Sequence, residues 1–231
     1  ILGNLPVTIE NVASLMHSSI EAPSRLDEVR QAIATMLHEP QIPLTENEGV
    51  LSFLSEKLRD IDLERTSVPL RSFEVRRITN EALRESFDPL PRATLLENLQ
   101  VTSGLKVQVS NSVQSLAGER SAIQTLIQFV DVTEYEGARA AAVEESWQKP
   151  AQIFLLGRTN ADIQTTAEEI YRCQQIDERH RNDPDQEVRE YCKNQINRAD
   201  GLKVELQRKL RQSLSQGSFV FRGQVTAVST L

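Results

Sequence analysis

The chain has 231 residues, of which 39% are hydrophobic and 26% are charged, with only 9 Gly and 9 Pro. This composition is typical of an ordered, helix-rich protein and excludes an intrinsically disordered one. No apolar run approaches the roughly 20 residues that a membrane-spanning helix needs, so we expect no contact with a membrane.

The chain starts at Ile1 without an initiator Met and stops at Leu231, soon after a strand-like run at residues 219–222. We therefore expect it to be a piece of a longer protein. Its first residues do not form a signal peptide, which favours a cytoplasmic location.

The net charge of −7 is concentrated at the front, because residues 1–65 contain 11 acidic and 5 basic side chains. Phosphate contacts need a local excess of Lys and Arg, so residues 1–65 are a poor candidate for binding DNA. Two amphipathic helices are predicted in it, the first capped by Thr8 and the second opened by a Ser24–Asp27 capping box. Their apolar stripes are Ile9, Val12, Ala13, Met16 and Ile20, and then Leu26, Val29, Ile33, Met36 and Leu37.

Residues 45–65 allow two interpretations. Thr45 and Glu48 form a capping-box pair ahead of an apolar stripe, which predicts one continuous helix. Alternatively, residues 50–55 are the returning strand of a hairpin, and the helix begins only at Ser55. We favour the hairpin, which gives a winged-helix-like unit at residues 1–66.

A helical connector is predicted at residues 67–100, with an apolar stripe that includes Phe73, Ile78, Ala82, Leu83 and Phe87. Residues 101–160 then predict a small α/β sheet. Strand patterns at residues 106–110, 123–130 and 151–156 enclose an Ala-rich helix at 134–147, and this order predicts a βαβ crossover. We place Trp147, at the end of that helix, in the core.

Residues 161–231 predict a helical hairpin that ends in a strand, with a charged break at residues 177–185. Gly201, which costs a helix about 1 kcal/mol relative to Ala, marks a point where the second helix can kink. The apolar stripe of that helix is Val188, Cys192, Ile196, Ala199, Leu202, Leu206, Leu210 and Leu214. The predicted fold class is therefore α+β and helix-rich.

No complete catalytic or metal-binding set of residues is found. The chain has no Gly-Lys-Ser/Thr sequence, so it lacks the P-loop that surrounds nucleotide phosphates. His17, His38 and His180 lie far apart, and Cys173 and Cys192 fall on apolar helix faces, where a thiol is usually a buried, reduced hydrophobe. We expect no zinc site, no cofactor and no enzymatic activity in this chain.

Two groups of residues are candidates for contacts. Arg158, Thr159 and Asn160 lie between a predicted strand and a helix, where α/β sheets bind anions or ligands; the alternative is a solvated Arg158 and an Asn160 that caps the helix. A basic face on the long C-terminal helix is a candidate for contact with nucleic acid, and a solvated outer face is the alternative. Its residues are Arg189, Lys193, Arg198, Lys203, Arg208, Lys209 and Arg211.

The segment at residues 209–223, which ends in Phe221-Arg222-Gly223, resembles the helix and FRG sequence of the large P-loop proteins of BREX phage-defence systems, the BrxC/PglY type. Residues 5–13 and 48–55 also resemble stretches that follow the ATPase core of that family. The matches are short and are scattered through most of the chain.

This resemblance implies a cytoplasmic, multidomain ATPase in a multisubunit anti-phage complex, with ATP and magnesium bound by the parent protein. Because the P-loop is absent here, no catalytic residue is carried over. We therefore expect a noncatalytic coupling or assembly module that contacts other subunits. The alternative is a nucleic-acid-binding module that uses the basic face of the C-terminal helix.

Overall fold

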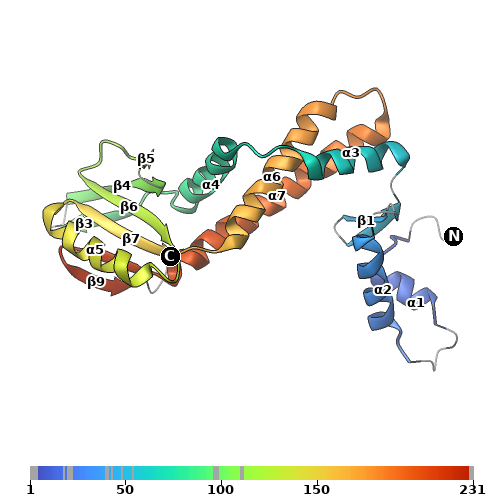
Figure 1. Ribbon diagram of the computed structural model, residues 1–231, viewed down its shortest axis with the longest axis horizontal. Coiled ribbons are helices and arrows are strands. Elements are labelled where there is room, and N and C mark those ends of the chain that lie inside the picture. Colours follow the sequence, from blue (N-terminus) through green and yellow to red (C-terminus); the bar gives the residue numbers. More distant parts are fainter. Residues whose placement is uncertain are drawn as a thin grey trace. The chain divides into compact units, whose positions relative to one another are not determined.

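The computed structural model describes residues 5–17, 19, 23–39, 42, 44–47, 49–53, 55–95, 99–109 and 112–228 (Figure 1). Contacts divide the chain into two compact units. Unit 1 comprises residues 1–68 and 175–195, and unit 2 comprises residues 69–174 and 196–231. This division differs from the four consecutive segments expected from the sequence, because the C-terminal helical hairpin contributes residues to both units.

The front of unit 1 contains α1 (Ile9–Leu15), α2 (Leu26–His38) and an antiparallel hairpin of β1 (Leu44–Asn47) and β2 (Val50–Phe53). The Thr8 hydroxyl accepts a hydrogen bond from the Asn11 amide at 3.2 Å, which confirms the predicted cap. A small core joins the three elements. It consists of Ala13, Val29, Ile33 and Leu51.

Two details of α2 differ from the prediction. Ser24 accepts a hydrogen bond from the Leu26 amide, whereas the Asp27 carboxylate pairs with Arg30, so the Ser24–Asp27 capping box does not form. Met36 is exposed, and the buried residues of α2 are Val29 and Ile33. Ile20 of the first predicted stripe lies outside the described residues, and so does residue 54 of the strand predicted at residues 50–55.

The hairpin interpretation of residues 45–65 is confirmed, and the continuous helix is wrong. Gly49 takes a left-handed φ of +79° at the turn, which a helix does not allow. The following helix, α3 (Glu56–Ser67), starts where Ser55 accepts a hydrogen bond from the Leu58 amide at 3.4 Å. The winged-helix likeness of this unit stays a prediction.

The rest of unit 1 is built from α3 and the adjoining ends of α6 (Ala161–His180) and α7 (Gln186–Ser215). Its buried side chains include Leu58, Ile61, Ile176, Val188 and Tyr191. Because α6 continues to His180, the break between the helices is shorter than predicted. Asp183 and Asp185 accept backbone amide hydrogen bonds there and open α7.

Unit 2 is built on a twisted sheet whose described strands run in the order β3-β4-β6-β7-β8-β9, with β5 also pairing with β4. The strands β4 (Leu99–Val109), β6 (Ile123–Val130) and β7 (Gln152–Arg158) are parallel, and the other pairings are antiparallel. The predicted βαβ crossover from β6 to β7 is confirmed. The sequence did not predict β3 (Arg92–Leu95), β5 (Ser112–Ala117) or β9 (Gln224–Ala227).

Helices cover both faces of this sheet. The crossover helix α5 (Tyr135–Gln148) packs on one face, against Leu126, Phe154, Leu156 and Val220. On the opposite face, Gly157 allows close contact with Leu214 of α7, and α4 (Ser72–Ser86) lies near the ends of the strands. The strand predicted near residues 219–222 is β8 (Ser218–Phe221), and it pairs with β7 inside this chain.

Trp147 is 69% exposed, so its predicted place in the core is wrong. The side chain that faces inward at this end of α5 is Ser146, which accepts a hydrogen bond from the Gly223 amide at 2.8 Å. The Trp147 ring instead lies over Gly223 in the β8–β9 turn, where a side chain would overlap the ring. Phe73 of α4 is likewise exposed rather than buried.

The stripe of α7 is confirmed, since Val188, Leu206, Leu210 and Leu214 are fully buried. Cys173 and Cys192 are both buried and free, as predicted. Gly201 lies within one uninterrupted helix. These elements confirm the predicted fold class, which is α+β with a high helix content.

Candidate functional site

The structure places Arg158, Thr159 and Asn160 at the carboxyl end of β7, but it does not bring their side chains into one site. The Arg158 guanidinium lies 5.1 Å from the centre of the Tyr135 ring at the start of α5. Thr159 and Asn160 instead line a cleft near α4 and α6. Asn160 also accepts a hydrogen bond from the Asp162 amide at 2.9 Å and so caps α6.

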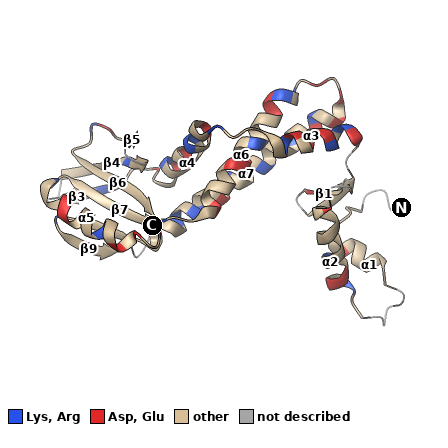
Figure 2. Ribbon diagram, in the orientation of Figure 1, with Lys and Arg blue, Asp and Glu red and all other residues tan. Residues whose placement is uncertain are grey.

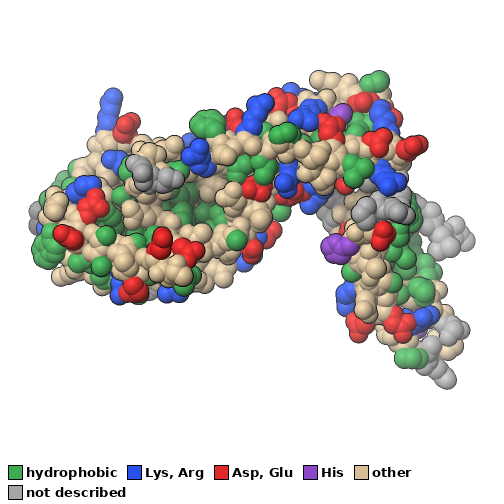
Figure 3. Space-filling view, viewed as in Figure 1, with side chains coloured by type: hydrophobic (Ala, Val, Ile, Leu, Met, Phe, Trp, Pro, Cys, Tyr) green, Lys and Arg blue, Asp and Glu red, His purple; other side chains and the backbone are tan. Residues whose placement is uncertain are grey.

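The cleft, called here the strand-end cleft, has a volume of about 630 Å³ and lies wholly within unit 2. It opens at the carboxyl ends of the parallel strands β4, β6 and β7, beside α4 and the first turns of α6. Figure 3 shows a hollow beside the sheet with hydrophobic side chains at its base.

The cleft combines an apolar floor with a polar rim. The floor includes Val75, Leu83, Val107, Phe129, Ile163 and Leu210. Four amide side chains stand on the rim, together with one guanidinium and one carboxylate. These are Asn80, Gln108, Asn160, Gln164, Arg76 and Glu168.

Of the residues that line this cleft, only Thr159 and Asn160 were predicted from the sequence as candidate site residues. The residues from α4 and β4 were missed because their role depends on the order of the strands. The sequence of α4 carries no signal for this role, because Thr79 and Asn80 lie among other polar residues such as Arg77 and Glu81.

The seven basic residues of α7 do not share one face. Successive residues of an α-helix are rotated by about 100°, which puts Arg198 and Lys209 nearly opposite Lys193 and Arg211. Arg198 pairs with Glu169 of α6 at 3.0 Å, and Lys209 donates a hydrogen bond to Thr166 at 2.9 Å. Figure 2 shows basic and acidic residues interspersed along α6 and α7.

The remaining basic residues fall into two groups. Lys203 pairs with Asp200, and Arg189 donates hydrogen bonds to the carbonyls of Asp183 and Pro184. By contrast, Lys193, Arg208 and Arg211 are exposed and form no ion pair with a described residue. Lys193 belongs to unit 1, so Arg208 and Arg211 are the exposed basic pair that unit 2 offers to a phosphate backbone.

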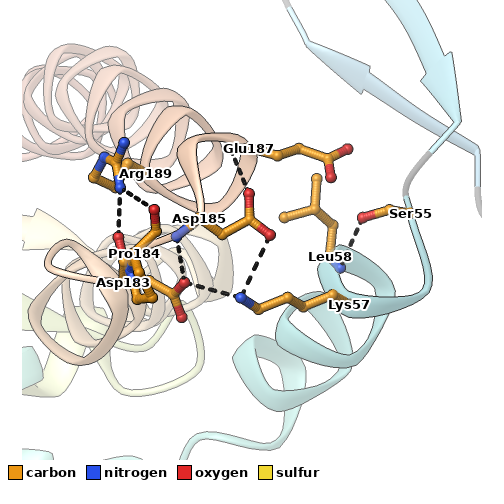
Figure 4. Close-up of polar contacts among 8 residues, drawn as sticks. All are labelled: Ser55, Lys57, Leu58, Asp183, Pro184, Asp185, Glu187 and Arg189. Carbon is orange, nitrogen blue, oxygen red and sulfur yellow. Dashed lines mark hydrogen bonds and ion pairs between the residues drawn. The ribbon is translucent and has the colours of Figure 1, made fainter.

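Unit 1 contains a polar contact between α3 and the turn that joins α6 to α7. Figure 4 shows Lys57 reaching Asp183 at 2.9 Å and Asp185 at 3.5 Å. The hydrogen bond from Lys57, assisted by its charge, lowers the pKa of Asp183 and correspondingly raises that of Lys57. The Lys57 and Asp185 side chains are exposed to solvent, so the contact adds little to the stability of the fold.

Two further polar contacts hold α3 in place. Glu64 accepts hydrogen bonds from Arg179 at 2.6 Å and contacts His180 at 2.8 Å, which lowers the Glu64 pKa. Tyr191 donates a hydrogen bond to Asp62 at 2.7 Å, and burial together with the Asp62 charge raises the Tyr191 pKa. Both contacts connect α3 to the helical hairpin formed by α6 and α7.

The buried cysteine of unit 1 has no sign of activation. Burial, followed by the charges of Asp177 and Asp183, raises the pKa of the Cys192 thiol to about 11. Because the thiolate is the nucleophilic form, this side chain is an inert part of the core.

Within the part of the chain that the structure describes, no group of three or more His, Cys, Asp or Glu side chains is placed to hold a metal ion. None of the described helices combines the length and the apolar character needed to cross a membrane. Comparisons with protein-family models, with curated proteins and with solved structures find no significant match.

Proposed function

We propose that this chain is a noncatalytic coupling or assembly module that binds other protein subunits through the acidic front of unit 1. The observation that carries the proposal is the exposure of large apolar side chains on this small, acidic part. Leu15 is 66% exposed and Phe53 is 70% exposed. Exposed apolar groups rimmed by charge are typical of protein contact surfaces.

The connectivity of the chain supports a coupling role. The polypeptide passes between the two units at residues 68–69, 174–175 and 195–196, the last two within α6 and α7. A partner that binds unit 1 therefore binds a part of the chain that shares two helices, α6 and α7, with unit 2.

The parent protein that fits this role best is a cytoplasmic P-loop ATPase of the BREX type, acting in anti-phage defence. This part of the proposal rests on the resemblance at residues 5–13, 48–55 and 209–223. In such a parent, ATP and magnesium are bound outside the present chain.

The proposal is tested by comparing the native chain with the double variant Leu15→Ser and Phe53→Ser. Partners captured by the native chain in its own cells are purified and titrated against both forms. We expect affinity to fall at least tenfold for the double variant, which corresponds to about 1.4 kcal/mol. Val204→Ser, an equally exposed site on α7, serves as the control. Equal affinities for the native chain and the double variant would contradict the proposal.

A second candidate function is nucleic-acid binding by Arg208 and Arg211 of unit 2, which are exposed and carry no ion pair to a described residue. Fluorescence anisotropy at low ionic strength, with duplex and single-stranded DNA, tests it. Binding that weakens steeply with salt and is lost on substituting both residues by Ala supports this function. No binding at micromolar DNA removes it.

A further inference from the structure

We propose that the strand-end cleft of unit 2 binds a small, neutral, flat molecule with an amide-type edge, which is the chemistry of a nucleobase. This site lies outside the surface on unit 1 that carries the proposed function. The two proposals are therefore tested by separate variants and stand independently.

The position of the cleft in the sheet favours ligand binding. The connection after β6 leads to α5 on one face of the sheet, whereas the connection after β7 leads to α6 beside the opposite face. Adjacent connections that leave on opposite faces open a crevice outside the carboxyl ends of the strands, where α/β sheets bind ligands.

The size and the floor of the cleft limit its ligand. Its volume of about 630 Å³ is in the range of small-molecule sites and exceeds that of an ordered ion or water molecule. The apolar floor includes the Phe129 ring, which offers a surface on which a flat ring system can lie.

The hydrogen-bonding groups on the rim specify the edge of the ligand. Asn80 donates to Gln114, Gln164 donates to Glu168, and Asn160 accepts from the Asp162 amide. Each side chain therefore keeps its other amide end without a partner among the described residues. Those ends are the carbonyl oxygens of Asn80 and Gln164 and the amino group of Asn160. Together they match a ligand edge that donates twice and accepts once.

The charges around the cleft disfavour a phosphate ligand. One cation, Arg76, and one anion, Glu168, stand on the rim, so their formal charges cancel. The Arg76 Nε atom also donates to the Ser72 carbonyl. A neutral ligand is compatible with a rim of zero net charge, whereas binding of a phosphate requires more hydrogen-bond donors and cations than acceptors and anions.

The proposal is tested with the full 231-residue chain and free adenosine, guanosine, cytidine and uridine at millimolar concentrations, using saturation-transfer NMR and calorimetric titration. Ribose 5-phosphate, which lacks the base, and nicotinamide, a simple aryl carboxamide, are the comparison ligands. We expect at least one nucleoside to bind with its base protons most strongly saturated. Ribose 5-phosphate should not bind.

The variants locate the site. Asn80→Ala and Gln164→Ala replace rim amides by the best helix-forming residue, and together they should weaken nucleoside binding about tenfold. Gln175→Ala removes a similar helical Gln–Glu contact outside the cleft and should bind like the native chain. Backbone amide NMR shifts of the native chain around residues 79–80 and 159–164 give an independent map that does not depend on any variant.

Several outcomes overturn the proposal. They are the absence of nucleoside binding at millimolar concentrations, equal binding by the Asn80/Gln164 double variant, and shifts confined to other residues. Binding of ribose 5-phosphate as tight as that of the nucleosides assigns the site to the ribose that these ligands share. Binding of nicotinamide without any nucleoside assigns it to simple aryl carboxamides. Either result contradicts the nucleobase assignment.

Discussion

Trp147 is the only tryptophan of the chain and its ring lies in contact with Gly223 while remaining 69% exposed. We expect its fluorescence emission to lie close to that of free indole in water and to be quenched readily by acrylamide. A blue-shifted emission that resists quenching would place the ring in the core. The exposed position also shows why a large aromatic residue at the end of a helix is a poor predictor of burial.

Two glycines with opposite surroundings give a matched pair of substitutions. A side chain at Gly217 would overlap the carbonyl oxygen of Leu156, so we expect Gly217→Ala to lower the free energy of unfolding by about 3 kcal/mol or more. Gly201 lies in open space within α7, and Gly201→Ala should raise stability by up to about 1 kcal/mol. Urea denaturation followed by circular dichroism measures both, and equal effects would contradict the close contact at Gly217.

Glu64 predicts how the stability of unit 1 depends on pH. Hydrogen bonds from Arg179 and contact with His180 lower its pKa below the ordinary value of 4.5. The unfolded chain therefore binds a proton before the folded chain does, and the stabilisation present above pH 4.5 is lost as the pH falls through the folded pKa.

The corresponding experiment measures the free energy of unfolding between neutral and acidic pH. We expect Glu64→Gln to have a shallower loss of stability on acidification than the native chain. Glu144→Gln, at an exposed position of α5 without an ion pair to a described residue, is the control and should keep the native slope. Identical slopes for Glu64→Gln and the native chain would show that this contact does not form in solution.

At the level of secondary structure elements, α7 shows how far periodicity determines stability. Leu206 is fully buried on the predicted stripe, whereas its near neighbour Val204 is exposed. Leu206→Ala should cost about 2–5 kcal/mol, because it removes buried methyl groups and leaves a cavity. Val204→Ala should change stability by less than about 0.5 kcal/mol. Thermal unfolding of the two variants decides whether α7 packs along this stripe.

The elements that the sequence predicted well have local signals. The stripe of α7 repeats over several turns, and the β1–β2 hairpin is marked by Gly49 at its turn. The strand β3 was missed because it is only four residues long, and β5 was missed because it does not alternate regularly between polar and apolar residues. Their pairing with β4 depends on contacts that the order of residues does not reveal.

The candidate site was less accessible to sequence reasoning. Asn160 was correctly seen as able to cap α6, and this cap is present. The strand-end cleft instead combines α4, β4 and α6, whose residues are separated by many positions in the chain. The basic residues of α7 show the same limit, since ion pairs to α6 and to α7 itself engage Arg198 and Lys203.

For the whole molecule, the two units give the chain two separate surfaces. Unit 1 presents exposed apolar side chains on an acidic front, and unit 2 presents a cleft with neutral amide groups. Both features are suited to recognition. We propose that this chain supplies contacts and no catalytic groups.

The proposal that this chain is noncatalytic is tested most directly by measuring phosphate release from ATP or GTP by the purified 231-residue chain. We expect no release above that of the buffer, with or without magnesium, because the chain has no P-loop sequence. Release that disappears when one side chain of this chain is replaced, such as Arg158→Ala, would contradict the account.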